Sequence, residues 1–182
     1  MTVLVEDACV FPLSYAQERL WFIDQLNPGI AAYNISEVVE FSLPLDATAL
    51  AHSLNEIVRR HEVLRTTFGA LQGEPFQIIA PPTPVPLPLR DLSQFTGAEQ
   101  EAEAARLTQE EAHTPFDLSC GPLLRAKLLR LNDTRYQLVL TMHHIISDGW
   151  SMEVLRRELS LLYEAFAAGR PSPLADRFRK GE

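Results

Sequence analysis

The chain has 182 residues and a net charge of −8, from 16 basic and 24 acidic side chains. A hydrophobic content of 46% and a charged content of 22% are those of a soluble globular domain with its own core. The acidic balance argues against a nucleic-acid partner, whose phosphates would need basic residues. No apolar run is long enough to span a membrane, and the first residues lack a signal-peptide pattern. Cys9 and Cys120 form no disulfide framework or metal motif. We therefore expect no membrane contact and a cytoplasmic location.

The first half of the chain predicts two helices and three strands. These elements are expected over residues 14–26, 34–41, 46–61, 64–68 and 75–80. Ser14 can cap the first helix, and Pro44 and Asp46 introduce the second. The last two strands are expected to form a hairpin around Gln72-Gly73.

The second half predicts helices over residues 97–113 and 151–168 and strands over 123–131 and 135–142. Five prolines between residues 81 and 90 predict an extended surface segment. Asn132-Asp133 is a turn-prone pair, so the two strands are expected to pair as a hairpin. The order of elements predicts an α+β fold, a two-layer sandwich of helices packed on a mixed β-sheet.

Two adjacent histidines, His143 and His144, end the last predicted strand, and Asp148-Gly149 follows them. An imidazole fixed at a strand end can accept or donate a proton near neutral pH. Gly149 could take a positive φ, which would bring the Asp148 carboxylate near the histidines or a basic partner. Zinc is the alternative, but neighbouring strand residues point to opposite faces and no further ligand lies at metal spacing, so we expect no metal.

Three segments, in the same order and spacing, resemble condensation domains of nonribosomal peptide synthetases. His143-His144 with Asp148-Gly149-Trp150 resembles the family's HHxxxDGW signature. The segment from Ser14 to Trp21, SYAQERLW, resembles its SxAQxRLW motif. The segment from Arg60 to Phe68, RHEVLRTTF, resembles its RHExLRTxF motif. The resemblance covers about residues 11–170.

The resemblance implies a fold and a domain organisation. Condensation domains have two lobes, each similar to chloramphenicol acetyltransferase, with the active site in a tunnel between them. A chain of 182 residues has the length of one such lobe. We therefore expect residues 1–182 to be the N-terminal lobe, with a polar tail over residues 171–182 and without the second lobe.

The resemblance also implies a reaction. The family joins an upstream aminoacyl or peptidyl thioester to the amine of a downstream aminoacyl group, and His144 is the implied catalytic imidazole. Carrier proteins present both substrates on 4'-phosphopantetheine arms, so no cofactor is expected to bind directly. His144 could act as a base on an amine with a pKa near ~8, or orientation could supply more of the rate. The expected partners are the two peptidyl carrier proteins, the second lobe and the adjacent synthetase domains.

The type of condensation domain follows from details of the same motifs. Trp150 directly after Asp-Gly, and Glu62 after His61, resemble the subtype that joins an L-configured donor to an L-configured acceptor. Heterocyclisation domains carry aspartate in place of the histidines and are excluded.

Several residues around His144 are expected to support the site. His143 should be buried and structural, and Asp148 should shape the loop by pairing with Arg65. Gly149 either allows a turn or lets substrate approach the backbone, and Trp150 should enter the core at a helix start. The residues that could line the tunnel are Trp150 and, from the opening motif, Ser14, Tyr15, Gln17 and Arg19. The four residues of the opening motif could instead belong to an ordinary amphipathic helix. The isolated histidines, expected to be solvated or packing residues, are His52, His61 and His113.

Two other functions stay open at this point. A self-sufficient acetyltransferase of the same fold would form a trimer whose subunits complete each other's sites. A non-catalytic unit would only dock a carrier protein.

Overall fold

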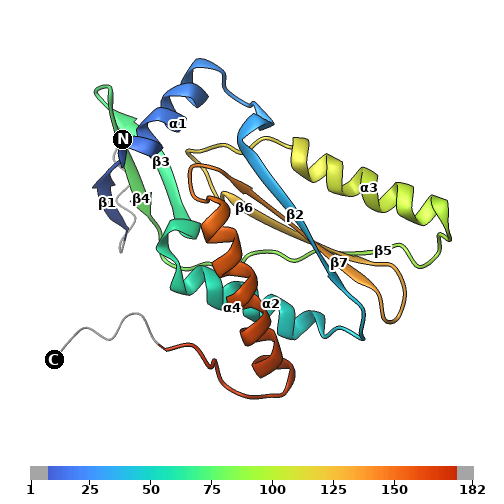
Figure 1. Ribbon diagram of the computed structural model, residues 1–182. Helices are drawn as coiled ribbons and strands as arrows, with labels where there is room; N and C mark the ends of the chain where they lie inside the picture. Colours follow the sequence, from blue (N-terminus) through green and yellow to red (C-terminus); the bar gives the residue numbers. More distant parts are fainter. Residues whose placement is uncertain (1–7, 176–182) are drawn as a thin grey trace.

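The computed structural model describes residues 8–175 and confirms an α+β fold with helices packed on β-sheets (Figure 1). The helices are α1 (Tyr15–Leu26), α2 (Ala47–Arg60), α3 (Ala98–His113) and α4 (Gly149–Ala167), with short 3-10 turns η1 (Ala31–Tyr33) and η2 (Glu62–Arg65). The strands are β1 (Cys9–Pro12), β2 (Asn34–Phe41), β3 (Thr66–Leu71), β4 (Glu74–Ile79), β5 (Leu89–Asp91), β6 (Leu124–Arg130) and β7 (Tyr136–His143). In this part of the chain, no helix is long and apolar enough to cross a membrane.

The strands form two sheets. The larger sheet has the order β2-β7-β6-β5, in which only β5 and β6 are parallel, so it is mixed as expected. The smaller sheet has the antiparallel order β1-β4-β3. The sequence did not predict β1 and β5, because they are four and three residues long and contain or follow prolines.

Strand β7 is the centre of the molecule, and its six residues from Leu138 to His143 are all buried. Leu138, Leu140 and Met142 belong to the core cluster under α2 and α4. Val139 points the other way, into a second cluster with Ala104 and Leu107 of α3. The expected two-layer sandwich therefore gains a further layer, because α3 covers the second face of the larger sheet (Figure 1).

Helix α2 shows how local sequence and packing agree. Its N-cap, Asp46, accepts hydrogen bonds from the backbone N–H groups of Thr48 and Ala49 at 2.8 and 3.0 Å. The apolar residues of one face are buried against the sheet and α4: Leu50, Leu54, Ile57 and Val58. The same logic on α4 buries Leu155, Leu159 and Leu162.

Residues 64–68 differ from the prediction. Leu64 and Arg65 lie in η2, where the N–H of Leu64 donates to the carbonyl of His61 at 3.0 Å. The strand begins only at Thr66, so the strand predicted over 64–68 is wrong for its first two residues. The hairpin is confirmed: Gln72 and Gly73 have φ of 53° and 88°, the left-handed pair of a tight two-residue turn.

The segment after α4 packs back on the fold as far as Ala175, whose carbonyl accepts a hydrogen bond from Arg60 at 2.9 Å. The rest of the polar tail predicted over residues 171–182 lies outside the described residues.

We predict that Leu54→Ala lowers the free energy of unfolding by about 2–5 kcal/mol, because it removes buried methyl groups and leaves a cavity. Leu54 is 1% exposed, whereas Leu161 on α4 is 39% exposed and serves as the matched control. Leu161→Ala should cost less than about 1 kcal/mol. Urea denaturation followed by circular dichroism measures both, and equal losses would contradict the packing described here.

Candidate active site

The histidine loop, residues 143–148, connects β7 to α4 and is held at its first residues by both neighbouring strands. The N–H of His143 donates to the carbonyl of Leu123 at 3.1 Å. The N–H of His144 donates to the carbonyl of Tyr33 at 2.8 Å, on the side of β2. The two imidazoles therefore leave a backbone that is fixed on both sides, and they leave it in opposite directions.

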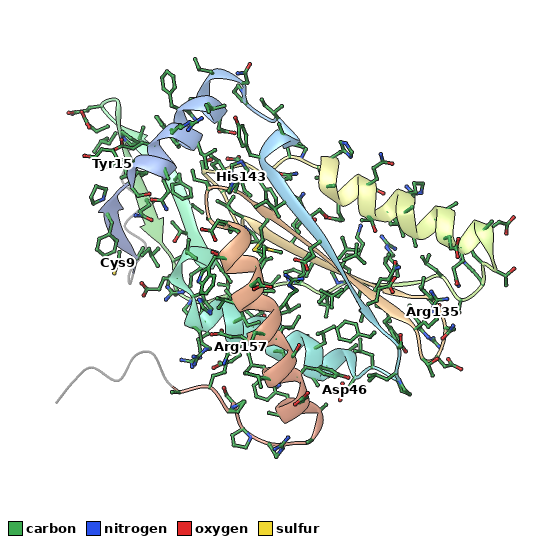
Figure 2. The ribbon with its side chains drawn as sticks, in the orientation of Figure 1. Cys9, Tyr15, Asp46, Arg135, His143 and Arg157 are labelled. Atoms are coloured by element: carbon green, nitrogen blue, oxygen red, sulfur yellow. The ribbon has the colours of Figure 1, made fainter. Side chains whose placement is uncertain are left out.

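His143 is buried, with 2% of its surface exposed (Figure 2). Its Nδ1 accepts a hydrogen bond from the N–H of Ile145 at 3.1 Å, so the proton of the neutral ring is on Nε2. The rings of Tyr33 and Phe116 lie 6.2 and 6.3 Å away, centroid to centroid. Burial, and secondarily the neighbouring His144, lowers the pKa of His143 to about 4. The predicted structural place of His143 is confirmed.

His144 is exposed, as predicted. Its Nδ1 lies 2.6 Å from the carbonyl oxygen of Ser147, which can only accept a hydrogen bond. Nδ1 therefore carries the proton of the neutral ring, and the lone pair of Nε2 is left free. This is the tautomer that a general base needs, held by a residue three positions along the chain.

Asp148 caps α4. Its Oδ1 accepts hydrogen bonds from the backbone N–H and the hydroxyl of Ser151 at 2.8 and 2.7 Å. These bonds, from the hydroxyl first, hold the pKa of the Asp148 carboxyl below its usual range, and nearby His144 adds a smaller effect in the same direction. Asp148 shapes the loop, as expected, by ending it on a helix.

The predicted ion pair between Asp148 and Arg65 is wrong. Arg65 donates instead to the carbonyl of Ala80 and to Glu62, the latter at 3.2 Å. Asp148 finds its partners within the first turn of its own helix and makes no ion pair within residues 8–175. The motif brings Arg65 to Ala80 at the end of β4, and the N–H of Ala80 in turn donates to the carbonyl of Arg65 at 3.1 Å.

The structure decides between the two alternatives for Gly149 and corrects the core position expected for Trp150. Gly149 is the first residue of α4 and is not among the glycines with positive φ, so the turn does not require it. A Cβ at this position would meet nothing within 4 Å, which leaves the alternative that substrate approaches the backbone here. Trp150 was expected in the core, but it is 75% exposed, because it lies in the first turn of α4 and not among the residues that this helix buries.

Ser14 is the N-cap of α1, and Tyr15, Gln17 and Arg19 lie on this helix. Figure 2 shows Tyr15 apart from His143. Ser14 and Gln17 form a capping box, and Gln17 also reaches Gln77 at 3.4 Å. Tyr15, 92% exposed, and Arg19 point to solvent. Among residues 8–175, no hydrogen bond or ion pair joins these four to the histidine loop.

Sequence reasoning missed one polar pair beside the loop. His61, expected to lack a chemical partner, has its Nε2 2.7 Å from Oε2 of Glu158. The two residues are 97 positions apart, and no local pattern connects them. In the described part of the chain, no cluster of three or more His, Cys, Asp or Glu residues could hold a metal ion.

Comparison with known proteins places this geometry in a family. A family model of the condensation domain matches residues 8–178. The chain belongs to the condensation-domain family. It is 50% identical over 169 residues to chondramide synthase cmdD of Chondromyces crocatus, which covers 93% of this chain and 4% of that protein. It is 47% identical to phosphinothricin tripeptide synthetase PhsC of Streptomyces viridochromogenes, over 90% of this chain and 15% of the relative.

Solved structures agree with this assignment. The first condensation domain of the calcium-dependent antibiotic synthetase, in complex with a substrate analogue, matches with a TM-score of 0.84 and 32% identity. The match covers 92% of this condensation-domain chain and 40% of that one. The chloramphenicol-acetyltransferase-like fold expected from the motifs is therefore confirmed, and the chain spans well under half the length of the proteins that it matches.

We predict that Arg65 and Asp148 act independently on stability. Asp148→Ala should cost about 0.5–2 kcal/mol because it removes the cap of α4. In a double-mutant cycle with Arg65→Ala, the coupling energy should stay below about 0.5 kcal/mol. The same cycle on Asp148 and Ser151, which do share hydrogen bonds, is the control. A coupling energy above about 1 kcal/mol between Arg65 and Asp148 would show that the two residues do form an ion pair.

We predict that the His143 imidazole titrates with a midpoint near pH 4. The folded pKa lies below the ~6.5 of an unfolded histidine, so protonation favours unfolding. The stability contributed by neutral His143 is complete above pH ~6.5 and is lost as the pH falls from there toward 4. Histidine NMR signals, assigned with His143→Gln, measure the midpoint, and a value near 6.5 would contradict the burial of the ring.

Proposed function

We propose that this chain is the N-terminal lobe of a nonribosomal peptide synthetase condensation domain, and that His144 is its catalytic imidazole. The observation that carries the proposal is the His144 ring, exposed to solvent while its Nδ1 is fixed on the Ser147 carbonyl. A free Nε2 on a rigid loop is the arrangement required to take a proton from an attacking amine.

The proposed reaction forms an amide. The amine nitrogen of the acceptor attacks the thioester carbonyl of the donor, the C–N bond forms and the C–S bond breaks. The proton lost by the amine passes to Nε2 of His144 and then to the departing thiolate. An α-amino group with a pKa near ~8 is partly protonated at neutral pH, so a neutral imidazole can also hold it in its reactive form.

The substrates in this proposal are an upstream aminoacyl or peptidyl thioester and a downstream aminoacyl amine, each on the phosphopantetheine arm of a carrier protein. Trp150, directly after Asp-Gly, supports an L-configured donor and an L-configured acceptor. Gly149 supports close approach, because the space beside its Cα is open.

A second lobe is part of the proposal because large apolar side chains of α1 and β1 are exposed. Helix α1 has no buried residue, and Tyr15, Phe22 and Leu26 are 92%, 58% and 63% exposed. On neighbouring β1, Val10 and Phe11 are 62% and 48% exposed. Apolar side chains gathered in this way favour a covering partner, and the solved relative has more than half of its length beyond the match.

Proximity decides what the lobe can do alone. Orientation of two reactants can lower a barrier by up to ~7–11 kcal/mol, whereas a lone imidazole contributes ~10²–10⁴-fold. We predict that the 182-residue chain alone forms almost no amide from carrier-bound substrates. Fusion to the segment that follows the matched region in chondramide synthase should restore turnover, and His144→Ala should then reduce it by ~10²–10⁴-fold.

The control for this experiment is His113→Ala. His113 lies on α3, where it is exposed and bonded to the carbonyl of Gln109, so its loss should leave turnover unchanged. Light scattering gives the oligomeric state in the same preparations. Full activity of the chain alone would contradict the proposal, and an active trimer would favour the self-sufficient acetyltransferase.

A further inference from the structure

A cavity of about 220 Å³ lies beside the histidine loop, between the start of α4, the turn η2 and the end of β7. Most of its wall is apolar, including Val63, Leu64, Ile146, Trp150 and Val154. An apolar cavity of ~150 Å³ can hold a benzene ring, so this one has room for a branched aliphatic or phenyl group.

The cavity and the catalytic imidazole share one residue. Ser147 lines the cavity, and its carbonyl oxygen holds Nδ1 of His144 at 2.6 Å. The hydroxyl of Ser147 is buried and has no hydrogen-bond partner within residues 8–175, which is costly unless a partner arrives. The loop that orients the His144 imidazole therefore also forms part of the cavity wall.

The rim of the cavity is left uncovered. Trp150 is 75% exposed and Val63 is 37% exposed, while Leu64 and Ile146 behind them are buried. Trp150 and Val154 are four residues apart on α4 and so lie on one face of the helix. An apolar occupant would remove the indole of Trp150 from water, and that burial would favour binding.

Resting on the function proposed above, we propose that this cavity receives the apolar side chain of an aminoacyl group in the condensation and selects its size. The occupant is an aliphatic or aromatic amino-acid side chain, carried by either the donor or the acceptor. The charged head of a lysine or glutamate side chain would lose its hydration against these walls, so the cavity discriminates against it.

The test uses the fluorescence of Trp150 in the 182-residue chain. Trp150 and Trp21 are its two tryptophans, so Trp21→Phe leaves one reporter at the rim. The probes are aminoacyl N-(2-acetamidoethyl)amides, in which NH replaces the thioester sulfur so that they do not react. The leucyl probe should shift the emission to the blue and bind at least ~10-fold more tightly than the glycyl probe, since each buried CH₂ contributes ~4-fold. The lysyl probe should bind no better than the glycyl probe.

Two substitutions locate the effect. Val154→Phe fills the cavity and should abolish the preference for leucyl over glycyl. Leu161→Phe adds a comparable bulk on the same helix outside the cavity wall and should leave the preference intact. Thermal melting of both variants checks that they are folded.

The N-acetylated leucyl probe shows whether the side chain in the cavity belongs to the donor or to the acceptor, because an acceptor needs a free amine and a donor does not. Tighter binding of the acetylated form assigns the donor, and tighter binding of the free amine assigns the acceptor.

Equal binding of the glycyl and leucyl probes, or a preference that survives Val154→Phe in a folded protein, would overturn this inference. Either result would leave amide formation dependent on His144 untouched. Conversely, side-chain-dependent binding together with His144-independent turnover would overturn the proposed mechanism and keep the cavity.

Discussion

The geometry of the site depends on one constraint, the pairing of β7 with strands on both sides up to its last residue. Asn34 of β2 stands opposite His143, and Leu123 holds His143 from the side of β6. A strand that is fixed in this way has no freedom to rotate, so consecutive side chains take opposite faces. His143, at the end of the strand, is buried, whereas His144 lies one residue beyond the strand and is exposed.

This division has an electrostatic consequence. A base must be able to accept a proton, and a positive charge on an adjacent residue would oppose that step. Because burial keeps His143 neutral at pH 7, with a pKa of about 4, it adds no such charge beside His144. The buried ring thus supports the exposed one by staying uncharged, while Tyr33 and Phe116 provide the packing that keeps water away from it.

The sequence was sufficient where the relevant interaction is local. Helical periodicity located α1 to α4, with capping residues at α1 and α2, and strand alternation predicted that the two histidines point in opposite directions. It failed where a residue could find either a local or a distant partner, and where a strand pairs with a distant segment. Asp148 was expected to reach Arg65, but capping its own helix needs no chain closure over 83 residues. Strand β5 was missed because the strand that it pairs with, β6, lies more than 30 residues away and β5 itself is three residues long.

The hydrogen bonds that orient His144 and cap α4 also join residues that are close together in the sequence. Nδ1 of His144 bonds the carbonyl of Ser147, and Asp148 bonds Ser151, so both close over three residues. Their closure costs little entropy and needs no partner, so the orientation and the tautomer of His144 are set within this chain. These local contacts do not exclude water from the site, because His144, Trp150 and the apolar side chains of α1 are all exposed. An exposed imidazole acts in a high dielectric, where electrostatic stabilisation of the transition state is weak. In the proposed reaction, this chain orients the proton acceptor, and whatever covers its open face would have to supply the dry, aligned path for the two substrates.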